Sequence, residues 1–272
     1  MPAHWILGPG TGNPYVDFTD ACNAQMPVVI LSSGQACVWY RLTLASKDGD
    51  WLVREEEEAL LVVRAQLARL GARYRLGAPL DVRWLRAGWS SHAEALSSDG
   101  LRLRFDFVSR PPRLTPERLA ALWDDVGTSA KAVVSRKDLV LLKQTMRLKD
   151  YAFIGSLATQ LPDPADQLRW TLDARHLLDL LQRHPQLRSR LAELRPACAD
   201  VVSESAAAER IDAEVRGLRA TDETRIRAYA MAQESWAGRF RSEGFGQQPL
   251  EQEHAALCAT AEGVLPMQVP CP

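Results

Sequence analysis

The feature that most constrains the fold is a change in hydrophobic pattern near residue 115. Before it, the apolar run MPVVIL (26–31) and the period-two segment LRLRFDFVS (101–109) predict strands. Between them, residues 54–72 carry apolar side chains at helical spacing and predict a long helix. After residue 115 the apolar positions follow the helical period alone. The sequence therefore predicts an α/β (α+β) core with a small mixed sheet, followed by an α-helical C-terminal region.

Changes in composition divide the chain into four predicted segments. The first is rich in Gly and Pro, and the last is rich in Gln, Pro and Gly and is expected to wander over the surface. Two further short strands are expected in the core, at RYRL and DVRWL. The four segments are an N-terminal arm (1–25), the α/β core (26–114), a helical region (115–243) and an irregular C-terminal tail (244–272).

Composition limits the classes of protein that the chain can belong to. Its net charge of −1 argues against a general nucleic-acid-binding protein, which usually carries a basic excess. No run of 18 apolar residues occurs, so no membrane partner is expected. The N-terminus has no basic leader or apolar core of a secretory signal, and the five cysteines form no C-x-x-C pair. We therefore expect a cytoplasmic protein.

The segment KDGDWLV holds two acids that are candidates for a metal site. Asp48 and Asp50, two residues apart on a strand, would project from the same face, roughly 7 Å apart at Cα. Carboxylates are the ligands that Mg²⁺ prefers, and Asp106, between two phenylalanines, is a third candidate. Acids make up 34 of the 272 residues, however, and a surface turn is the alternative interpretation. These residues alone leave both interpretations open.

A second candidate lies upstream, where an apolar strand is followed by the small-residue turn Ser33-Gly34. Small residues at the start of a helix let backbone N–H groups approach a phosphate. The earlier segment GPGTG (8–12) lacks the Lys-Ser/Thr of a phosphate loop, so we interpret it as part of the arm.

These motifs together resemble the nucleotidyltransferase superfamily related to DNA polymerase beta. The order is a small turn opening a short helix, Asp-x-Asp on the next strand and one Asp on a later strand. More narrowly, the chain resembles the small bacterial nucleotidyltransferases that include abortive-infection and toxin–antitoxin toxins. The resemblance covers roughly residues 26–158. Ser33 stands where the family has its first glycine, and Gly49 stands where it has an apolar residue between the aspartates.

The resemblance implies a Mg²⁺-dependent enzyme that moves a nucleoside monophosphate from an NTP to a hydroxyl of RNA, a protein or a small molecule. Asp48 and Asp50 would bind two Mg²⁺ ions, and Asp106 would complete the site and polarise the acceptor. Ser33 and Gly34 would hold the triphosphate.

A helix that follows the third strand in the family adds further candidates. Lys143 would neutralise the triphosphate, and Arg147 and Lys149 lie in the family's Arg-x-Lys-Asp run. The alternative for all three is a solvated helix face. In the toxin branch a protein partner such as an antitoxin is also expected.

Other interpretations stay open from the sequence. The chain could be a catalytically degenerate member that binds a nucleotide or a protein partner, or a helical interaction module with the α/β half as scaffold. The histidines, among them His92 and His254, show no metal-ligand spacing. Trp51 is expected in the core, with the wall of a base pocket as its alternative.

Overall fold

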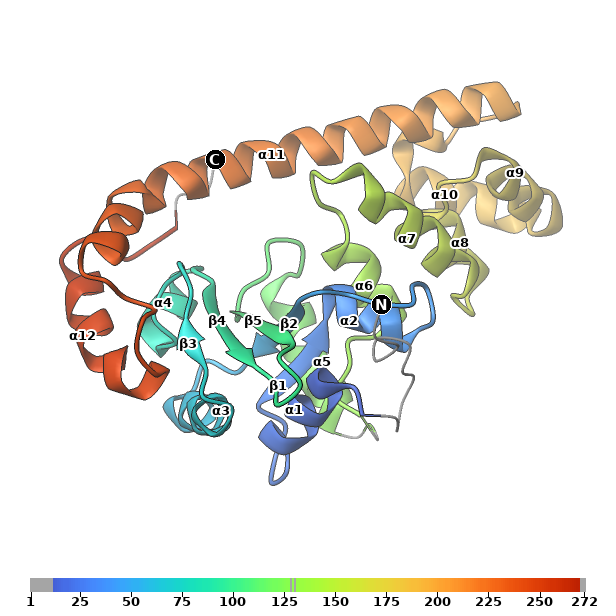
Figure 1. The fold of residues 1–272 in the computed structure, drawn as a ribbon. Helices are drawn as coiled ribbons and strands as arrows, with labels where there is room; N and C mark the ends of the chain where they lie inside the picture. The colour runs from blue at the N-terminus through green and yellow to red at the C-terminus, as the bar shows by residue number, and fades with distance from the viewer. Residues whose placement is uncertain (1–11, 128, 130, 270–272) are drawn as a thin grey trace. The chain divides into compact units, whose positions relative to one another are not determined.

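The computed structural model describes residues 12–127, 129 and 131–269 (Figure 1). The chain divides into two compact units. The sheet unit combines Met1–Val134 with Arg227–Pro272, and the helical unit is Ser135–Ile226. Residues 8–11 of the GPGTG segment lie outside the described residues.

The sheet unit is built on a five-stranded mixed sheet, as the sequence predicts. The strand order is β1-β2-β5-β4-β3, with β2 and β5 parallel and the other neighbours antiparallel. The strands are β1 (Val29–Ser32), β2 (Gly49–Val53), β3 (Arg73–Tyr74), β4 (Ser91–Leu96) and β5 (Arg102–Val108).

Among the described residues, six helices lie wholly in the sheet unit. Helix α1 begins where the Asn13 side chain accepts hydrogen bonds from the backbone N–H groups of Tyr15 and Val16, with Pro14 at the first helical position. The long helix predicted after β2 is confirmed. The six helices are α1 (Pro14–Cys22), α2 (Ser33–Trp39), α3 (Glu57–Arg69), α4 (Val82–Arg86), α5 (Pro116–Gly127) and α12 (Leu250–Glu262).

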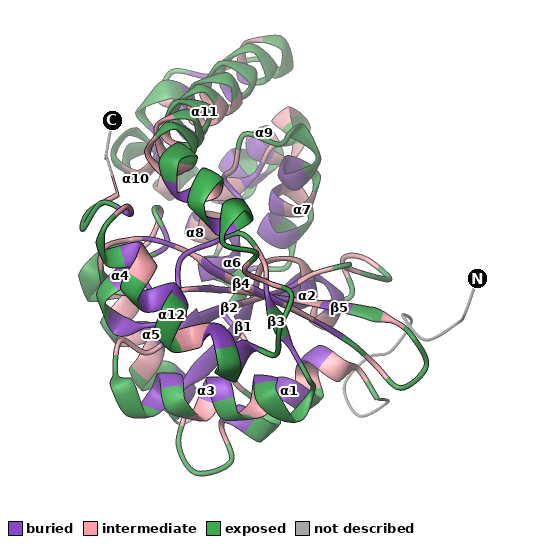
Figure 2. Ribbon diagram, turned by 60° about the vertical axis from the view of Figure 1, so that its left-hand side comes forward, coloured by how far each residue is buried: buried purple, intermediate pink, exposed green. Residues whose placement is uncertain are grey.

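One face of the sheet forms an aromatic core. The Trp51 ring stacks on Phe105 and Phe107, with centroids 5.6 and 5.4 Å apart, and Phe18 of α1 packs against all three. The indole Nε1 of Trp51 donates to Thr19 Oγ1 at 2.8 Å. Trp51 is fully buried, and along β4 and β5 buried residues alternate with partly buried or exposed ones (Figure 2). Trp51 is therefore a core residue, and its interpretation as a base-pocket wall is wrong.

Two expectations about local structure are wrong. The segment DVRWL forms the helix α4, because Asp81 caps it by accepting from Arg83 N–H, and this turns Trp84 and Leu85 into the core. The tail 244–272 is not irregular, because α12 lies within it. Leu250, Leu257 and Ala261 recur at helical spacing and are buried in the core of the sheet unit.

The boundary between the units also differs from the expected one at residue 114. After α5 the backbone of residues 132–134 pairs with the edge strand β1, with Leu31 N donating to Ala132 O at 2.8 Å and Val134 N to Leu31 O at 3.0 Å. These bonds satisfy an exposed strand edge and keep α5 in the sheet unit. The helical unit therefore begins at Ser135.

The helical unit is a cluster of short helices around a leucine core. Ser135 caps the first helix by accepting from Asp138 N–H. At the centre, buried Arg195 bonds Glu214 at 2.6 Å and donates to the carbonyl of Thr171 at 2.7 Å. The helices are α6 (Arg136–Leu142), α7 (Leu148–Thr159), α8 (Pro164–Trp170), α9 (Ala174–Arg183), α10 (Arg188–Leu194), the short η1 (Pro185–Leu187) and η2 (Pro196–Cys198), and the first part of α11 (Glu204–Ser242).

Membrane-spanning segments were searched among the described residues. No helix there has both the length and the apolar character needed to cross a membrane.

Candidate carboxylate site

The parallel strands β2 and β5 bring two of the candidate aspartates side by side. Asp50 is the register partner of Asp106. Asp48 lies one residue before β2, and its Oδ1 is 3.3 Å from Nη1 of Arg104, which shares the face of Asp106 two residues along β5. The three acids therefore project from the face of the sheet opposite to Trp51 and its aromatic neighbours.

Basic side chains from the neighbouring strands contact these acids. Asp106 Oδ1 is 2.6 Å from Nδ1 of His92, its register partner on β4, and 3.3 Å from Nη1 of Arg75. Sequence reasoning missed His92, Arg75 and Arg104. The period-two pattern could have found Arg104 two residues before Asp106, whereas His92 needed the pairing of β4 with β5.

A hydrogen-bonded chain extends from Asp106 through His92. His92 Nε2 lies 2.9 Å from Ser90 Oγ, which lies 2.8 Å from the Tyr229 hydroxyl. This order of Asp, His and Ser occurs in hydrolases. Here, however, Ser90 directly precedes a strand instead of occupying a nucleophile turn, and its hydroxyl is shared with Tyr229. The chain of contacts orients the Asp106 carboxylate.

The Ser33-Gly34 turn lies beside the aspartates because Ser32 is the register partner of Asp50. Ser33 has φ of 47°, a conformation that favours glycine. A Cβ on Gly34 would lie 2.1 Å from Ser46 Oγ, so this position accepts no larger residue without movement of Ser46. The turn is consequently held close to the segment that leads into Asp48.

The glycine between the two aspartates is explained by the core beneath it. A Cβ on Gly49 would lie 2.3 Å from the ring of Trp51 and 2.5 Å from that of Tyr15. The Tyr15 hydroxyl donates to Lys47 O at 2.7 Å. Burial, with further contributions from Asp48 and Asp106, raises the pKa of Tyr15 to about 12, so the phenol stays neutral and holds this backbone.

Lys143 lies in the helical unit and is buried. Its Nζ is 3.4 Å from Asp150 Oδ1 and 5.3 Å from the ring centroid of Phe153. The alternative of a solvated helix face is therefore wrong for Lys143, whereas Arg147 and Lys149 are exposed. Burial would raise the pKa of Asp150, but Lys143, Thr145 and Arg147 outweigh it and hold this pKa below its ordinary value.

The acids on the sheet face fit a magnesium site in the kind of ligand that they offer. All three are carboxylates, which Mg²⁺ prefers. Their ligand atoms do not form a set within 4.8 Å of one another, because Asp48 turns toward Arg104. This ion pair is partly exposed, 40% for Asp48 and 37% for Arg104, and such pairs stabilise proteins by about 0–1 kcal/mol. The ion pair between Asp48 and Arg104 therefore contributes little to stability.

A tighter set of metal-ligand types lies elsewhere in the sheet unit. Ligand atoms of Asp81, His254 and Cys258 all lie within 4.8 Å of one another, and they form the one such set of three among the described residues. His254 and Cys258 are four residues apart on α12 and share a helix face. The expectation that His254 shows no metal-ligand spacing is therefore wrong.

Comparisons with known proteins identify no family for this chain. No family model matches the sequence, and no curated protein matches it. The chain is similar to a crystal structure from H. pylori described as a "putative nucleotidyltransferase", at 12% identity, over 78% of this chain and 94% of that one, with a TM-score of 0.38. A TM-score at this level carries no argument. The fold and site themselves define an α/β protein with a carboxylate-bearing sheet face.

Proposed function

We propose that the chain is a cytoplasmic, Mg²⁺-dependent nucleotidyltransferase that moves a nucleoside monophosphate from an NTP to a hydroxyl acceptor. The observation that carries the proposal is the common face of Asp50 and Asp106 on two parallel strands, with Asp48 one residue before β2 and paired with Arg104 of β5. The Ser33-Gly34 turn beside Asp50 supports it, because an NTP needs contacts to its phosphates as well as to its metal ions.

In the proposed reaction the acceptor oxygen bonds to the α-phosphorus, the bond from that phosphorus to the β-phosphate oxygen breaks, and diphosphate leaves. Asp106 accepts the hydroxyl proton. His92 and Arg75 both contact its Oδ1, so Oδ2 is the oxygen that would face the acceptor. Bound Mg²⁺, held by the three aspartates, would neutralise the charge on the phosphates.

The proposed phosphate contacts come from the turn and from one lysine. Backbone N–H groups of Ser33 and Gly34 would approach the triphosphate, because the turn carries small residues. Lys143 would add a positive charge, and for this its ammonium group would have to leave Asp150. Replacing Lys143 with alanine tests that contact by the concentration of NTP needed for half-maximal label transfer.

The proposed acceptor is a hydroxyl on RNA, a protein or a small molecule. Resemblance to the toxin branch supports a toxin role with an antitoxin-like protein partner. Growth of a bacterial host that expresses the wild-type chain or Asp106→Ala tests this role. Equal growth of the two strains would contradict it.

A second candidate is a degenerate member that binds a nucleotide without transferring it. The arginine and histidine contacts of Asp48 and Asp106 favour it, because they neutralise the acids without a metal. Under this candidate an NTP would stabilise the protein equally with and without Mg²⁺.

A thermal-shift experiment tests the nucleotide and metal site. We expect Mg²⁺ with an NTP to raise the melting temperature of the wild type, and to do so much less for the double variant Asp48→Asn/Asp50→Asn. Asp20→Asn, which changes an exposed acid on α1, is the matched control and should behave like the wild type. Equal increases in melting temperature for the double variant and the control would contradict the proposal that these aspartates bind Mg²⁺ and the NTP.

Label transfer from an NTP labelled at its α-phosphate tests catalysis. The wild type should label an acceptor in a cell extract, and Asp106→Ala should lower the rate by at least about 100-fold, the usual contribution of a general base. Unchanged labelling by Asp106→Ala would contradict the role given to this residue.

A further inference from the structure

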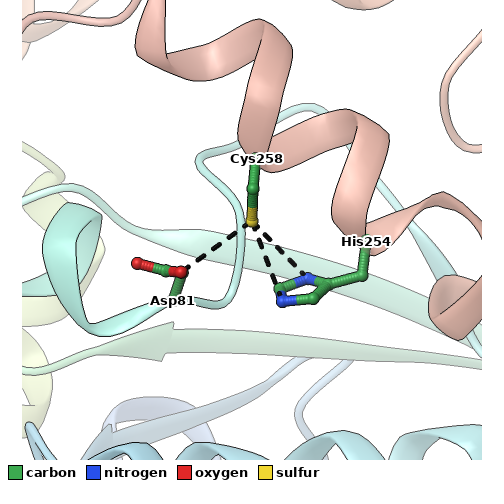
Figure 3. Close-up of side chains that lie close together, drawn as sticks. All are labelled: Asp81, His254 and Cys258. Carbon is green, nitrogen blue, oxygen red and sulfur yellow. Dashed lines mark hydrogen bonds between the residues drawn. The ribbon is translucent and has the colours of Figure 1, made fainter.

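The second site of interest lies between α12 and the loop that begins α4, within the sheet unit (Figure 3). Cys258 Sγ is 3.9 Å from Asp81 Oδ2 and 3.8 Å from His254 Nε2. Asp81 and Cys258 are both 8% exposed. Neither the proposed transfer reaction nor the carboxylate face uses these three side chains.

Two of the three separations between the ligand atoms are close to those of a tetrahedral zinc site, and the third is within 4.8 Å. With a Zn–S bond of about 2.3 Å and Zn–N or Zn–O bonds of about 2.0–2.1 Å, ligand atoms at the tetrahedral angle lie about 3.5 Å apart. The observed separations of 3.8 and 3.9 Å exceed this by a few tenths of an ångström, a movement that a side chain can make by rotation. A thiolate, an imidazole and a carboxylate also form the ligand mixture that zinc accepts.

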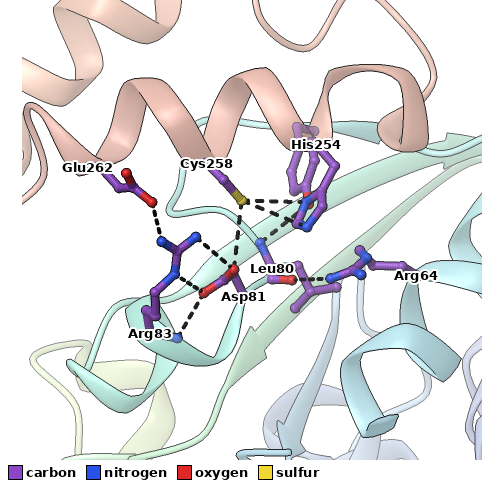
Figure 4. Close-up of polar contacts among 8 residues, drawn as sticks. Arg64, Leu80, Asp81, Arg83, His254, Cys258 and Glu262 are labelled. Carbon is purple, nitrogen blue, oxygen red and sulfur yellow. Dashed lines mark hydrogen bonds and ion pairs between the residues drawn. The ribbon is translucent and has the colours of Figure 1, made fainter. Parts of the chain in front are cut away.

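The surrounding groups orient two of the ligands (Figure 4). The Tyr74 hydroxyl lies 2.7 Å from His254 Nδ1, so a proton on Nδ1 would leave Nε2 as the ligand. Arg83 donates from Nε to Asp81 Oδ1 at 2.9 Å and from Nη2 to Oδ2 at 3.1 Å. A carboxylate oxygen accepts two such bonds, so Oδ2 keeps a position for a metal.

The positive charges of Arg64 and Arg83 equal in number the negative charges of Asp81 and Glu262 around the cluster. Arg83 also contacts Glu262, and Arg64 donates to Leu80 O at 3.1 Å (Figure 4). A thiol must lose its proton to become a ligand.

We propose that Asp81, His254 and Cys258 bind one zinc ion, with water in the fourth position, and that this ion fastens α12 to the start of α4. The site is independent of the proposed transferase chemistry. Its burial and its position between two segments far apart in the sequence favour a structural role.

Metal binding by the full chain tests this proposal directly. After treatment with a chelator, the wild type should bind about one Zn²⁺ per chain in equilibrium dialysis. Co²⁺ in its place should give the intense visible bands of a tetrahedral site and a thiolate-to-cobalt charge-transfer band. Absence of that charge-transfer band in the folded wild type would overturn the proposal. This measurement uses the wild-type protein alone.

Substitutions locate the bound ion. Cys258→Ser and His254→Gln should each lose the stoichiometric zinc, whereas Cys22→Ser, at another buried cysteine of the sheet unit, should retain it. Asp48→Asn/Asp50→Asn should also retain it, which separates this site from the carboxylate face. Tyr74→Phe should weaken zinc binding by about 10–100-fold, the usual effect of losing a group that orients a ligand.

Alkylation of the Cys258 thiol in the wild type, with and without zinc, tests the site even if a ligand variant does not fold. Zinc should slow the alkylation of Cys258 in the wild type, followed by mass spectrometry, and should leave the alkylation of Cys22 unchanged. Zinc retained by both ligand variants, or equal alkylation of Cys258 with and without zinc, would overturn the site.

Discussion

At the scale of single residues, the sheet places charged and aromatic groups on opposite faces of the same strands. Alternation puts Asp50 and Asp106 on one face and Trp51 and Phe105 on the other. The candidate site is therefore coupled to the core, because any change at Gly49 or Trp51 moves the backbone that carries the acids.

Gly49 gives a test of that coupling. Gly49→Ala should destabilise the protein by about 1–3 kcal/mol, because its Cβ would overlap the rings of Trp51 and Tyr15. Urea unfolding measures this change. Gly238→Ala, on α11 with nothing within 4 Å of its Cβ, is the control and should leave stability unchanged or raise it by up to about 1 kcal/mol. Equal effects of the two substitutions would contradict the packing argument.

The buried pair of Lys143 and Asp150 predicts a pH dependence of stability. The folded-state pKa of Asp150 lies below its unfolded value, so the carboxylate contributes stability above about pH 4, and this is lost as the pH falls through the folded pKa. Asp150→Asn should cost about 3–5 kcal/mol at pH 7, because it leaves Lys143 buried without its partner carboxylate.

Urea unfolding at a series of pH values measures this loss. The difference between wild type and Asp150→Asn should shrink in acid. Asp179→Asn, in an exposed pair with Arg183, is the control and should change stability by less than about 1 kcal/mol at every pH. A difference that stays constant down to the acid limit would show that the charge of Asp150 does not matter.

At the scale of elements, helix α12 shows how a segment of polar composition becomes part of a core. Residues 244–272 are rich in Gln, Pro and Gly, yet Leu250, Leu257 and Ala261 recur on one face of α12 and are buried. The backbone N–H of Leu250 donates to Ala72 O at 2.8 Å, which joins the start of α12 to the chain after α3. The helical spacing of the apolar residues predicts the structure of this segment better than its polar composition does. A narrow apolar stripe is enough to bury one face of a helix.

Leu257 tests the contribution of this helix. Leu257→Ala should destabilise the sheet unit by about 2–5 kcal/mol, because the side chain is fully buried and its loss leaves a cavity. Chemical denaturation measures the effect, with Leu61→Ala as the control, since Leu61 on α3 is 55% exposed. A loss below about 1 kcal/mol for Leu257→Ala would show that α12 is peripheral to the core.

At the scale of the whole molecule, the sheet unit is formed by two parts of the chain that are far apart in sequence. Trp236, Phe240 and Leu257 join the same core as the strands, although nearly a hundred residues of the helical unit separate them from β1 to β5 in sequence. The helical unit is thus inserted between two parts of the sheet unit.

Truncation tests this organisation. A chain that ends at Ile226 lacks the aromatic and leucine side chains that complete the core, so it should lose the cooperative unfolding transition of the sheet unit. Near-ultraviolet circular dichroism during denaturation measures this. A truncated chain with the wild-type transition would show that residues 227–272 are dispensable for folding.

The sequence by itself determined the elements whose pattern is local. Period two predicted β5, helical spacing predicted α3, and the Asp-x-Asp pair with an Asp on a later strand indicated the three candidate metal ligands. Local patterns report on one element at a time because they depend on the spacing of residues along the chain.

Tertiary structure decided which elements meet. The parallel pairing of β2 with β5 set Asp50 beside Asp106, and the pairing of β4 set His92 against Asp106. The same is true of the set formed by Asp81, His254 and Cys258, because Asp81 precedes Cys258 by 177 positions in sequence yet its Oδ2 lies 3.9 Å from Cys258 Sγ. Strand register and long-range packing depend on the whole core. The spacing of residues along the chain therefore could not predict them.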